Sequence, residues 1–133
     1  MILLDTHVLV WLTEGNPRLG SNSLQQINRA LVEEQLAVTS ISFWEIGMLV
    51  EKQRLTIAMD LQVWRRDLLD HGIQEVFLHG RPALAAGSLK NFHGDPADRM
   101  IVATALDLPA TLVTADQKIL GWPGLDTKID ARH

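Results

Sequence analysis

Four short apolar runs, separated by longer stretches with helical periodicity, constrain the fold of this chain more than any other feature. Each run has the length and apolar character of a buried strand, and they span Ile2–Leu4, Leu36–Thr39, Glu75–Leu78 and Thr111–Thr114. Parallel strands need crossover connections, which helices usually supply. The alternation therefore predicts an α/β protein with three layers, α/β/α, around a mainly parallel sheet of four to five strands.

Helices are expected in the segments between these runs, followed by a short edge strand. Apolar spacing and cap residues predict helices over Thr6–Glu14, from a cap at Asn22 or Ser23, over Ser40–Gln53, from Asp60 to Gly72, over Pro82–Leu89 and over Asp95–Asp107. A helical turn after Asp116 and an edge strand at Thr127–Ile129 complete the expected elements. Because the chain has 133 residues and no linker or internal repeat, we expect one domain spanning residues 1–133.

The composition is typical of a soluble globular protein and excludes several classes of function. Cysteine is absent, which rules out thiol catalysis, cysteine-based zinc sites and a disulfide framework. No secretory signal and no membrane-length apolar run is evident, so we expect a cytoplasmic protein with no membrane partner. The net charge of −4 argues weakly against a broad basic surface for nucleic acid. It does not exclude a nuclease whose acids bind cations.

Acidic side chains stand where the expected strands end and the helices begin. Asp5 follows the first run, Glu45 lies in the helix after the second, and Asp116 follows the last. Asp98 lies in the first turn of the helix that Asp95-Pro96 opens. Parallel strands bring their carboxyl ends to one edge of a sheet, so residues this far apart in sequence can meet in one crevice. A cluster of carboxylates in such a crevice would bind metal ions.

Each of these acids also has a purely structural interpretation as part of a helix start. Aspartate is a favoured N-cap residue, and Asp5 and Asp116 both precede helices. Ser42 and Glu45 have the spacing of a capping box, in which the glutamate reaches back to the cap amide. Helix initiation also explains Asp95 and Asp98. Only the shared setting of the four acids favours metal binding over capping.

Oxygen ligands favour magnesium or manganese over zinc, since the chain lacks cysteine and has no paired-histidine spacing. Of the five histidines, only His7 and His93 fall near the expected crevice. The basic residues form no cluster along the sequence, and a solvated surface is the simpler expectation for each. Those that can still converge in the fold are Lys52, Arg54, Arg65, Arg66, Lys90 and Arg99.

Four motifs surround the acidic residues in an order and spacing that is more specific than any motif alone. They are Leu4–Trp11, Ser40–Ile46, Asp95–Ala105 and Val113–Asp116. In these motifs the chain resembles the PIN-domain ribonucleases, and among them the VapC-type toxins of prokaryotic toxin–antitoxin pairs. The resemblance covers essentially the whole length.

The resemblance implies an endoribonuclease, the toxin of a toxin–antitoxin pair, that uses magnesium or manganese to activate water for cleavage of RNA phosphodiesters. It also implies a homodimer and an antitoxin that inserts a C-terminal segment into the active site. Among the acids, Asp5 and Asp98 are our choice of direct metal ligands. The roles of the other two are left open: each can bind through water, complete the shell of a second ion, or act as a base.

The site that the resemblance implies has two groups of residues. The catalytic and metal-binding acids are Asp5, Glu45, Asp98 and Asp116. The supporting residues are Asp95, Thr6 and Thr114.

Two other functions compete with a nuclease. A receiver-like signalling module has a similar length and acids at strand ends, but it needs a phosphoacceptor aspartate after a middle strand and a lysine after a late one. The second strand here ends Thr39-Ser40 and the fourth ends Thr114-Ala115-Asp116, which lacks these residues. The other alternative is a catalytically inactive PIN-like binding domain, in which the acids serve only as caps. Helices bearing Trp11, Trp44 and Trp64 are expected to carry apolar patches that an antitoxin or a second subunit covers.

Overall fold

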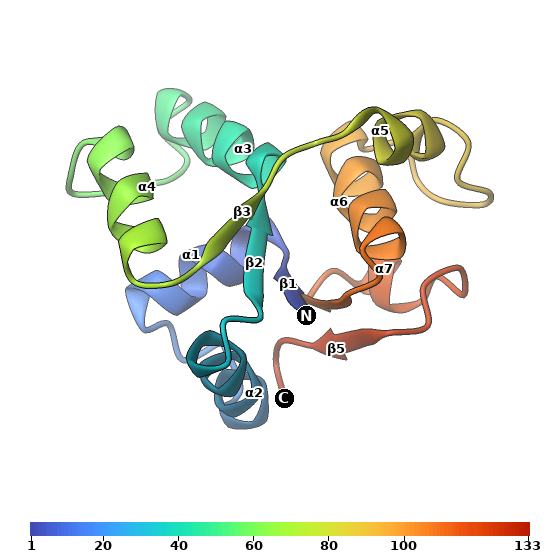
Figure 1. Ribbon diagram of the computed structural model, residues 1–133. Helices are drawn as coiled ribbons and strands as arrows, with labels where there is room; N and C mark the ends of the chain where they lie inside the picture. The colour runs from blue at the N-terminus through green and yellow to red at the C-terminus, as the bar shows by residue number, and fades with distance from the viewer.

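The computed structural model describes residues 1–133 and contains five strands and seven helices (Figure 1). In chain order they are β1 (Ile2–Leu4), α1 (Thr6–Glu14), α2 (Ser21–Val32), β2 (Leu36–Thr39), α3 (Ser40–Glu51), α4 (Leu61–Asp70), β3 (Gln74–Val76), α5 (Gly80–Ala86), α6 (Pro96–Asp107), β4 (Thr111–Thr114), α7 (Gln117–Leu120) and β5 (Lys128–Asp130).

The five strands form one sheet in the order β3-β2-β1-β4-β5, and every neighbouring pair is parallel. The first strand of the chain is therefore the central one, with Leu4 paired to Val38 on one side and to Val113 on the other. Helices cover both faces of this sheet (Figure 1). The predicted three-layer α/β/α fold with a mainly parallel sheet is confirmed.

Alternate residues of the central strands point into two separate apolar cores, one on each face of the sheet. Leu4, Val38 and Val113 belong to the core shared with α1 to α4. Leu3, Ala37 and Leu112 belong to the core shared with α6 and α7. Because side chains alternate along a strand, burial on both faces requires the continuous apolar runs that the sequence shows.

Aspartates begin four of the helices, as the cap signals predict. Asp5, Asp60, Asp95 and Asp116 occupy the N-cap positions of α1, α4, α6 and α7, and each side chain accepts at least one backbone N–H. Capping satisfies amide groups that would otherwise lack a partner at a helix start. Three of these caps, Asp5, Asp95 and Asp116, lie at strand ends or beside the same sheet edge.

The start of α2 differs from the expectation of a cap at Asn22 or Ser23. The helix begins at Ser21 and Gly20 occupies the cap position without any side-chain bond. The end of the chain packs closely here: the Gly20 amide donates to the Ala131 carbonyl, and a Cβ at residue 20 would overlap the backbone of Arg132 and His133. Ser23 instead donates to the Asp130 carbonyl at 2.9 Å. This tertiary contact, rather than local cap chemistry, fixes the helix start.

The third strand is shifted toward the N-terminus relative to the expected Glu75–Leu78. It pairs with β2 through Thr39 and Val76, and β2 ends at Thr39, so Phe77 and Leu78 have no partner strand. Phe77 is exposed. The other boundary changes are small: α5 begins at Gly80 rather than Pro82, α3 ends at Glu51, and β5 covers Lys128–Asp130.

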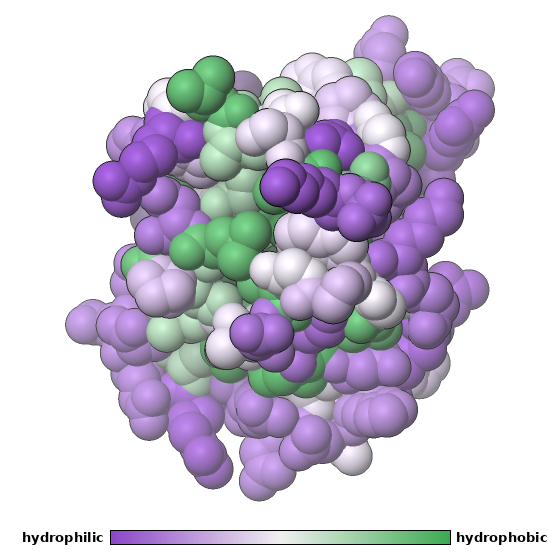
Figure 2. All heavy atoms as spheres, turned by 90° about the vertical axis from the view of Figure 1, so that its right-hand side faces the viewer, coloured by the Kyte–Doolittle hydropathy of each residue, from purple (hydrophilic) through white to green (hydrophobic).

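The surface over the α5 and α6 side of the molecule carries a band of apolar groups between hydrophilic margins (Figure 2). Large apolar residues with substantial exposure include Trp44 on α3, Phe77 after β3 and Leu84 on α5. None of the helices combines the length and the apolar character needed to cross a lipid bilayer.

Candidate active site

Asp5 lies at the carboxyl end of the central strand, and its side chain is fixed by two donors. It is 2% exposed, and its Oδ1 accepts the Thr6 amide at 2.8 Å. Its Oδ2 accepts the hydroxyl of Thr114, at the end of the neighbouring strand β4, at 2.7 Å. The cap role and an inward-facing carboxylate therefore coexist in one residue.

Glu45 reaches the same edge from α3 and is held by Thr6. The Thr6 hydroxyl donates to Glu45 Oε1 at 2.5 Å and lies 2.9 Å from the Ser42 hydroxyl. The capping-box interpretation of Glu45 is wrong, because Thr39 is the cap of α3 and accepts the Ser42 amide. Glu45 is therefore free of any cap role and its carboxylate faces the other acids.

Asp98 projects from the first turn of α6 and contacts a histidine. His93 Nε2 lies 2.8 Å from Asp98 Oδ2, and both side chains are largely buried. Asp95, the expected supporting acid, is exposed and caps α6 by accepting the amides of Ala97 and Asp98. Asp95 therefore positions the first turn of α6, because one oxygen of its carboxylate accepts both backbone amides.

Arg99 holds the loop that presents His93. Its guanidinium donates to four backbone carbonyls, one at the end of α5 and three in the segment that connects α5 to α6, at distances of 2.8 to 3.1 Å. These acceptors are Ala86, Leu89, Phe92 and His93. The guanidinium carbon also lies 5.9 Å from the centroid of the Phe92 ring. A planar group with five donors suits such convergent carbonyls.

Asp116 caps α7 and is coupled to Asp5 through Thr114. Its Oδ1 accepts the Lys118 amide at 2.8 Å, and its own amide donates to the Thr114 hydroxyl at 3.0 Å. The same hydroxyl donates to Asp5. Thr114 thus fixes two acids at once, and Thr6 fixes Asp5 and Glu45 in the same way from the other side.

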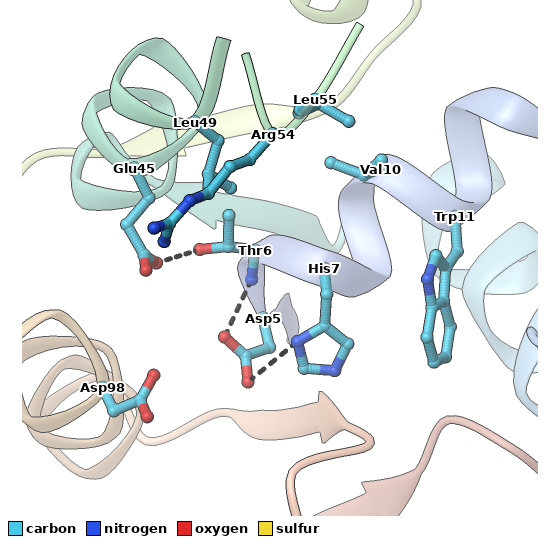
Figure 3. A pocket seen from close by; sticks show the side chains of 10 residues that line it. All are labelled: Asp5, Thr6, His7, Val10, Trp11, Glu45, Leu49, Arg54, Leu55 and Asp98. Carbon is cyan, nitrogen blue, oxygen red and sulfur yellow. Dashed lines mark hydrogen bonds and ion pairs between the residues drawn. The ribbon is translucent and has the colours of Figure 1, made fainter. Parts of the chain in front are cut away.

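A hollow of about 230 Å³ brings three of the four predicted acids together (Figure 3). Asp5, Glu45 and Asp98 come from β1, α3 and α6, and their carboxylates face a common space in Figure 3. Asp116 lines an adjoining hollow, also of about 230 Å³, which shares His7 and Trp11 with the first. The structure therefore gathers the acids along one sheet edge, while their assignment as catalytic and metal-binding residues stays a prediction.

Burial and mutual repulsion raise the pKa of two of the acids. Partial burial, with smaller contributions from the charges of Asp5, Asp98 and Asp95, raises the pKa of Glu45 to about 7, although the Thr6 bond opposes this. Partial burial, with added repulsion from Asp5, Asp95 and Asp116, raises the pKa of Asp98 to about 6, although the His93 bond opposes this. Neither carboxylate forms an ion pair with a lysine or arginine.

Without metal, the free energy of unfolding is expected to fall as the pH rises from about 4 to about 7. In this window the folded protein holds protons on Glu45 and Asp98 that the unfolded chain has released, because their folded pKa values exceed the ordinary 4.5 and 3.8. We expect a loss of about 1–2 kcal/mol, since solvent screens both groups. Denaturant unfolding in a chelator measures it. A Glu45→Gln variant should lose about half of this pH dependence, because the raised pKa of Asp98 remains. A stability that rises through the window would contradict the expectation.

The donor set fits a divalent cation. His93, Asp98 and Asp116 each offer one ligand atom, and these three atoms lie within 4.8 Å of one another. Asp5 and Glu45 add carboxylate oxygens next to this group. A bound cation would relieve the repulsion between these carboxylates, which form no ion pair with a lysine or arginine.

Two histidines and one arginine complete the site, and the sequence motifs left their roles open. His7 Nε2 accepts the Ala115 amide at 2.9 Å, so its proton resides on Nδ1, which lies 3.7 Å from Asp5 Oδ2. His93 contacts Asp98, as described above. Arg54 lines the hollow that holds Asp5, Glu45 and Asp98. In the sequence it is one of several scattered basic residues, and nothing there indicates a role in the site.

A family model described as the PIN domain matches residues 2–121 of the chain. The chain belongs to the PIN domain family. This confirms the resemblance that the four motifs indicated. The residues that match the PIN family model include strands β1, β2, β3 and β4 and every acid of the site.

This PIN-domain chain is also similar to a curated protein, Ribonuclease VapC22 of Mycobacterium tuberculosis. The two are 36% identical over 119 residues, which cover 89% of this chain and 88% of the relative.

Solved structures share the fold at lower sequence identity. A VapBC2 structure from Rickettsia felis, bound to a DNA fragment from its promoter, matches with a TM-score of 0.71 and 18% identity, over 98% of this chain and all of the other. A toxin–antitoxin complex from Klebsiella pneumoniae matches with a TM-score of 0.66 and 20% identity, over 98% of both chains. These matches show the PIN fold of this chain.

Proposed function

We propose that this PIN-domain chain is a divalent-metal-dependent endoribonuclease of the VapC type, which hydrolyses RNA phosphodiesters in the cytoplasm. The observation that carries the proposal is the convergence of Asp5, Glu45 and Asp98 in one hollow, with Asp116 beside it. RNA as the substrate class is supported by the 36% identity to a protein named a ribonuclease.

Magnesium or manganese is the proposed cofactor, because oxygen ligands dominate the donor set. The residues that would hold it are Asp5, Asp98, Asp116 and Glu45, and His93 is placed to add one nitrogen. When bound, the cation would lower the pKa of a water molecule and offset charge on the leaving oxygen.

The chain's own residues orient the acids for this task. The Thr6 hydroxyl donates to one oxygen of Glu45, and the Thr6 amide and the Thr114 hydroxyl donate to the two oxygens of Asp5. His93 fixes one oxygen of Asp98. Because Thr6 and Thr114 belong to a packed helix and strand, and Arg99 holds the loop that carries His93, the carboxylates are positioned before substrate arrives. This limits the reorganisation needed during reaction.

Removing divalent metal is expected to reduce RNA cleavage by about 1,000-fold, since the cation supplies several kcal/mol of charge stabilisation. Purified protein would be incubated with a labelled single-stranded RNA pool, with magnesium or manganese and with excess chelator. Re-addition of metal should restore cleavage. Equal cleavage with and without chelator would contradict the proposed chemistry, and no cleavage under any condition would favour the inactive binding domain.

A second copy of the chain is the proposed partner for the exposed apolar residues. Trp44 is 54% exposed, Phe77 62% and Leu84 83%, which is unusual for large apolar side chains. A homodimer would cover such residues. The molecular mass in solution tests this, and a monomer at micromolar concentration would contradict it.

An antitoxin protein is proposed to cover the apolar hollow next to the acids. This hollow of about 340 Å³ is lined by Val10, Ile57, Met59 and Trp64, among others, and Val10 also lines the acid hollow. Similar folds occur in structures described as toxin–antitoxin complexes. The co-expressed antitoxin should inhibit cleavage by the wild-type chain. A Met59→Asp variant should still cleave RNA but should no longer be inhibited.

The receiver-like alternative finds no support in the site. A receiver requires a lysine beside its acids, and no lysine lines the hollow that holds Asp5, Glu45 and Asp98 or the one that holds Asp116. The basic side chains there are histidine and arginine.

A further inference from the structure

The acidic site has two hollows, one on each side of His7. Both are lined by His7 and Trp11, and both are open to solvent. The first contains Asp5, Glu45 and Asp98, and the second contains Asp116. Because they share these two residues, the hollows adjoin each other at the carboxyl edge of β1 and β4, and acids line both of them.

Each hollow contains one guanidinium group. Arg54, from the segment that connects α3 to α4, lines the first hollow, and Figure 3 shows its side chain extending over Thr6 toward Glu45. It is exposed and forms no side-chain hydrogen bond or ion pair. Arg132 lines the second hollow.

Arg132 is held in place by groups that leave most of its donors available. Its Nη1 donates to the Ala115 carbonyl at 2.6 Å, and its guanidinium carbon lies 5.8 Å from the centroid of the Trp11 ring. Nε and Nη2 make no bond within the chain. A guanidinium stacked on an aromatic ring with free donors is pre-organised to bind a phosphate through two parallel bonds.

Three other arginines are bound to structural partners. Arg65 binds Glu75, Arg81 binds Asp107, and Arg99 donates to four backbone carbonyls. The scarcity of free cations near the acids matters because the chain carries a net charge of −4 and its carboxylates repel phosphate. Binding of a polyanion needs positive groups beside them.

We propose that the RNA backbone crosses the acid cluster from Arg54 to Arg132, with one phosphate bound by each guanidinium and the scissile phosphodiester between them. This inference rests on the proposed ribonuclease function and adds the residues that hold the substrate on either side of the cleavage point. The two arginines contact backbone phosphates only, so they raise affinity for any single-stranded RNA and do not select its sequence.

A structural role for each arginine is the competing interpretation. Arg54 could serve to offset the charge of Glu45, and Arg132 could serve to attach the end of the chain to Ala115 and Trp11. These roles would change stability, but they would not change how RNA binding depends on salt. The salt dependence of binding counts the phosphates that a protein neutralises, which separates the two interpretations.

The test measures RNA binding in the Asp98→Asn background, in which cleavage is expected to be blocked. Fluorescence anisotropy of a labelled single-stranded RNA oligonucleotide would be followed in magnesium over a range of KCl concentrations, for the parent, Arg54→Gln, Arg132→Gln and the double variant. Arg18→Gln is the matched control, because Arg18 is exposed and lines neither hollow. Melting temperatures without RNA accompany each measurement.

We expect each single variant to weaken binding about 3- to 10-fold and to reduce the slope of log affinity against log salt by about 0.7, the value for one phosphate of a single strand. The double variant should lose about twice that slope, and Arg18→Gln should match the parent. In the cleaving enzyme, Arg54→Gln should raise KM more than it lowers kcat.

Parent-like salt slopes in both single variants would overturn the proposal, even if their melting temperatures fell. If the wild-type chain cleaves RNA while these slopes stay unchanged, the RNA path is wrong and the ribonuclease function stands. If the wild-type chain neither binds nor cleaves RNA, both are overturned.

Discussion

Replacing Asp98 by asparagine is expected to reduce RNA cleavage by at least about 1,000-fold, because it removes a charge that acts only through the metal site and the transition state. The introduced amide can still form a hydrogen bond with His93, so the loop geometry should persist. Asp98 is a cleaner position than Asp5, whose two oxygens also accept bonds from Thr6 and Thr114.

The stability of the same variant supplies an independent check. Burial and like charges raise the pKa of Asp98 to about 6, so at pH 8 its ionised carboxylate destabilises the folded protein relative to the unfolded chain. Without metal, Asp98→Asn should therefore melt at the same temperature as the wild type or slightly higher, while losing activity. Asp126→Asn is the matched control: it lies before β5, at the amino end of the strands, and should keep full activity. If purified Asp98→Asn cleaves RNA at the wild-type rate, the catalytic assignment of Asp98 is wrong.

Replacing Arg99 by alanine is expected to lower the free energy of unfolding by about 2–4 kcal/mol, more than the replacement of any other charged residue at the surface. The change leaves four backbone carbonyls without their donor and removes the contact with Phe92. Because His93 belongs to this loop, Asp98 should lose its partner and cleavage should fall as well. Arg99→Lys keeps the charge but cannot reach all four carbonyls, so it should be intermediate.

Arg81→Ala provides the comparison for this prediction. Arg81 pairs with Asp107 in a salt bridge whose arginine side chain is 84% exposed, and such pairs contribute about 0–1 kcal/mol. Urea unfolding of the three variants would rank them. A free energy of unfolding for Arg99→Ala within the range of Arg81→Ala would mean that the loop between α5 and α6 does not depend on the guanidinium.

The elements that local chemistry determines could be predicted from the sequence. Apolar runs located β1, β2 and β4, and the caps Asp5, Asp95 and Asp116 located three of the helix starts that surround the site. These parallel strands are buried on both faces, and few arrangements other than helices on each side of the sheet achieve this. The three-layer α/β/α fold could therefore be predicted correctly.

The features that the sequence could not predict depend on contacts between distant segments. Ser42 and Glu45 have capping-box spacing, yet Glu45 faces Thr6, which is 39 positions away, and Thr39 takes the cap. The end of β3 depends on where β2 stops, and the start of α2 depends on the packing of the chain end against Gly20. Likewise, nothing local distinguishes Arg54 from other exposed basic residues.

The central position of β1 has a consequence for synthesis of the protein. During synthesis Asp5 is made before its hydrogen-bond partner Thr114, which lies 109 positions later and arrives on β4, the strand that must dock beside β1. Asp116 comes later still. A nascent or truncated chain that lacks β4 therefore carries the first acid without the last, and the whole cluster forms only after β4 and Asp116 have been made. Translation products that end before β4 are therefore expected to lack nuclease activity.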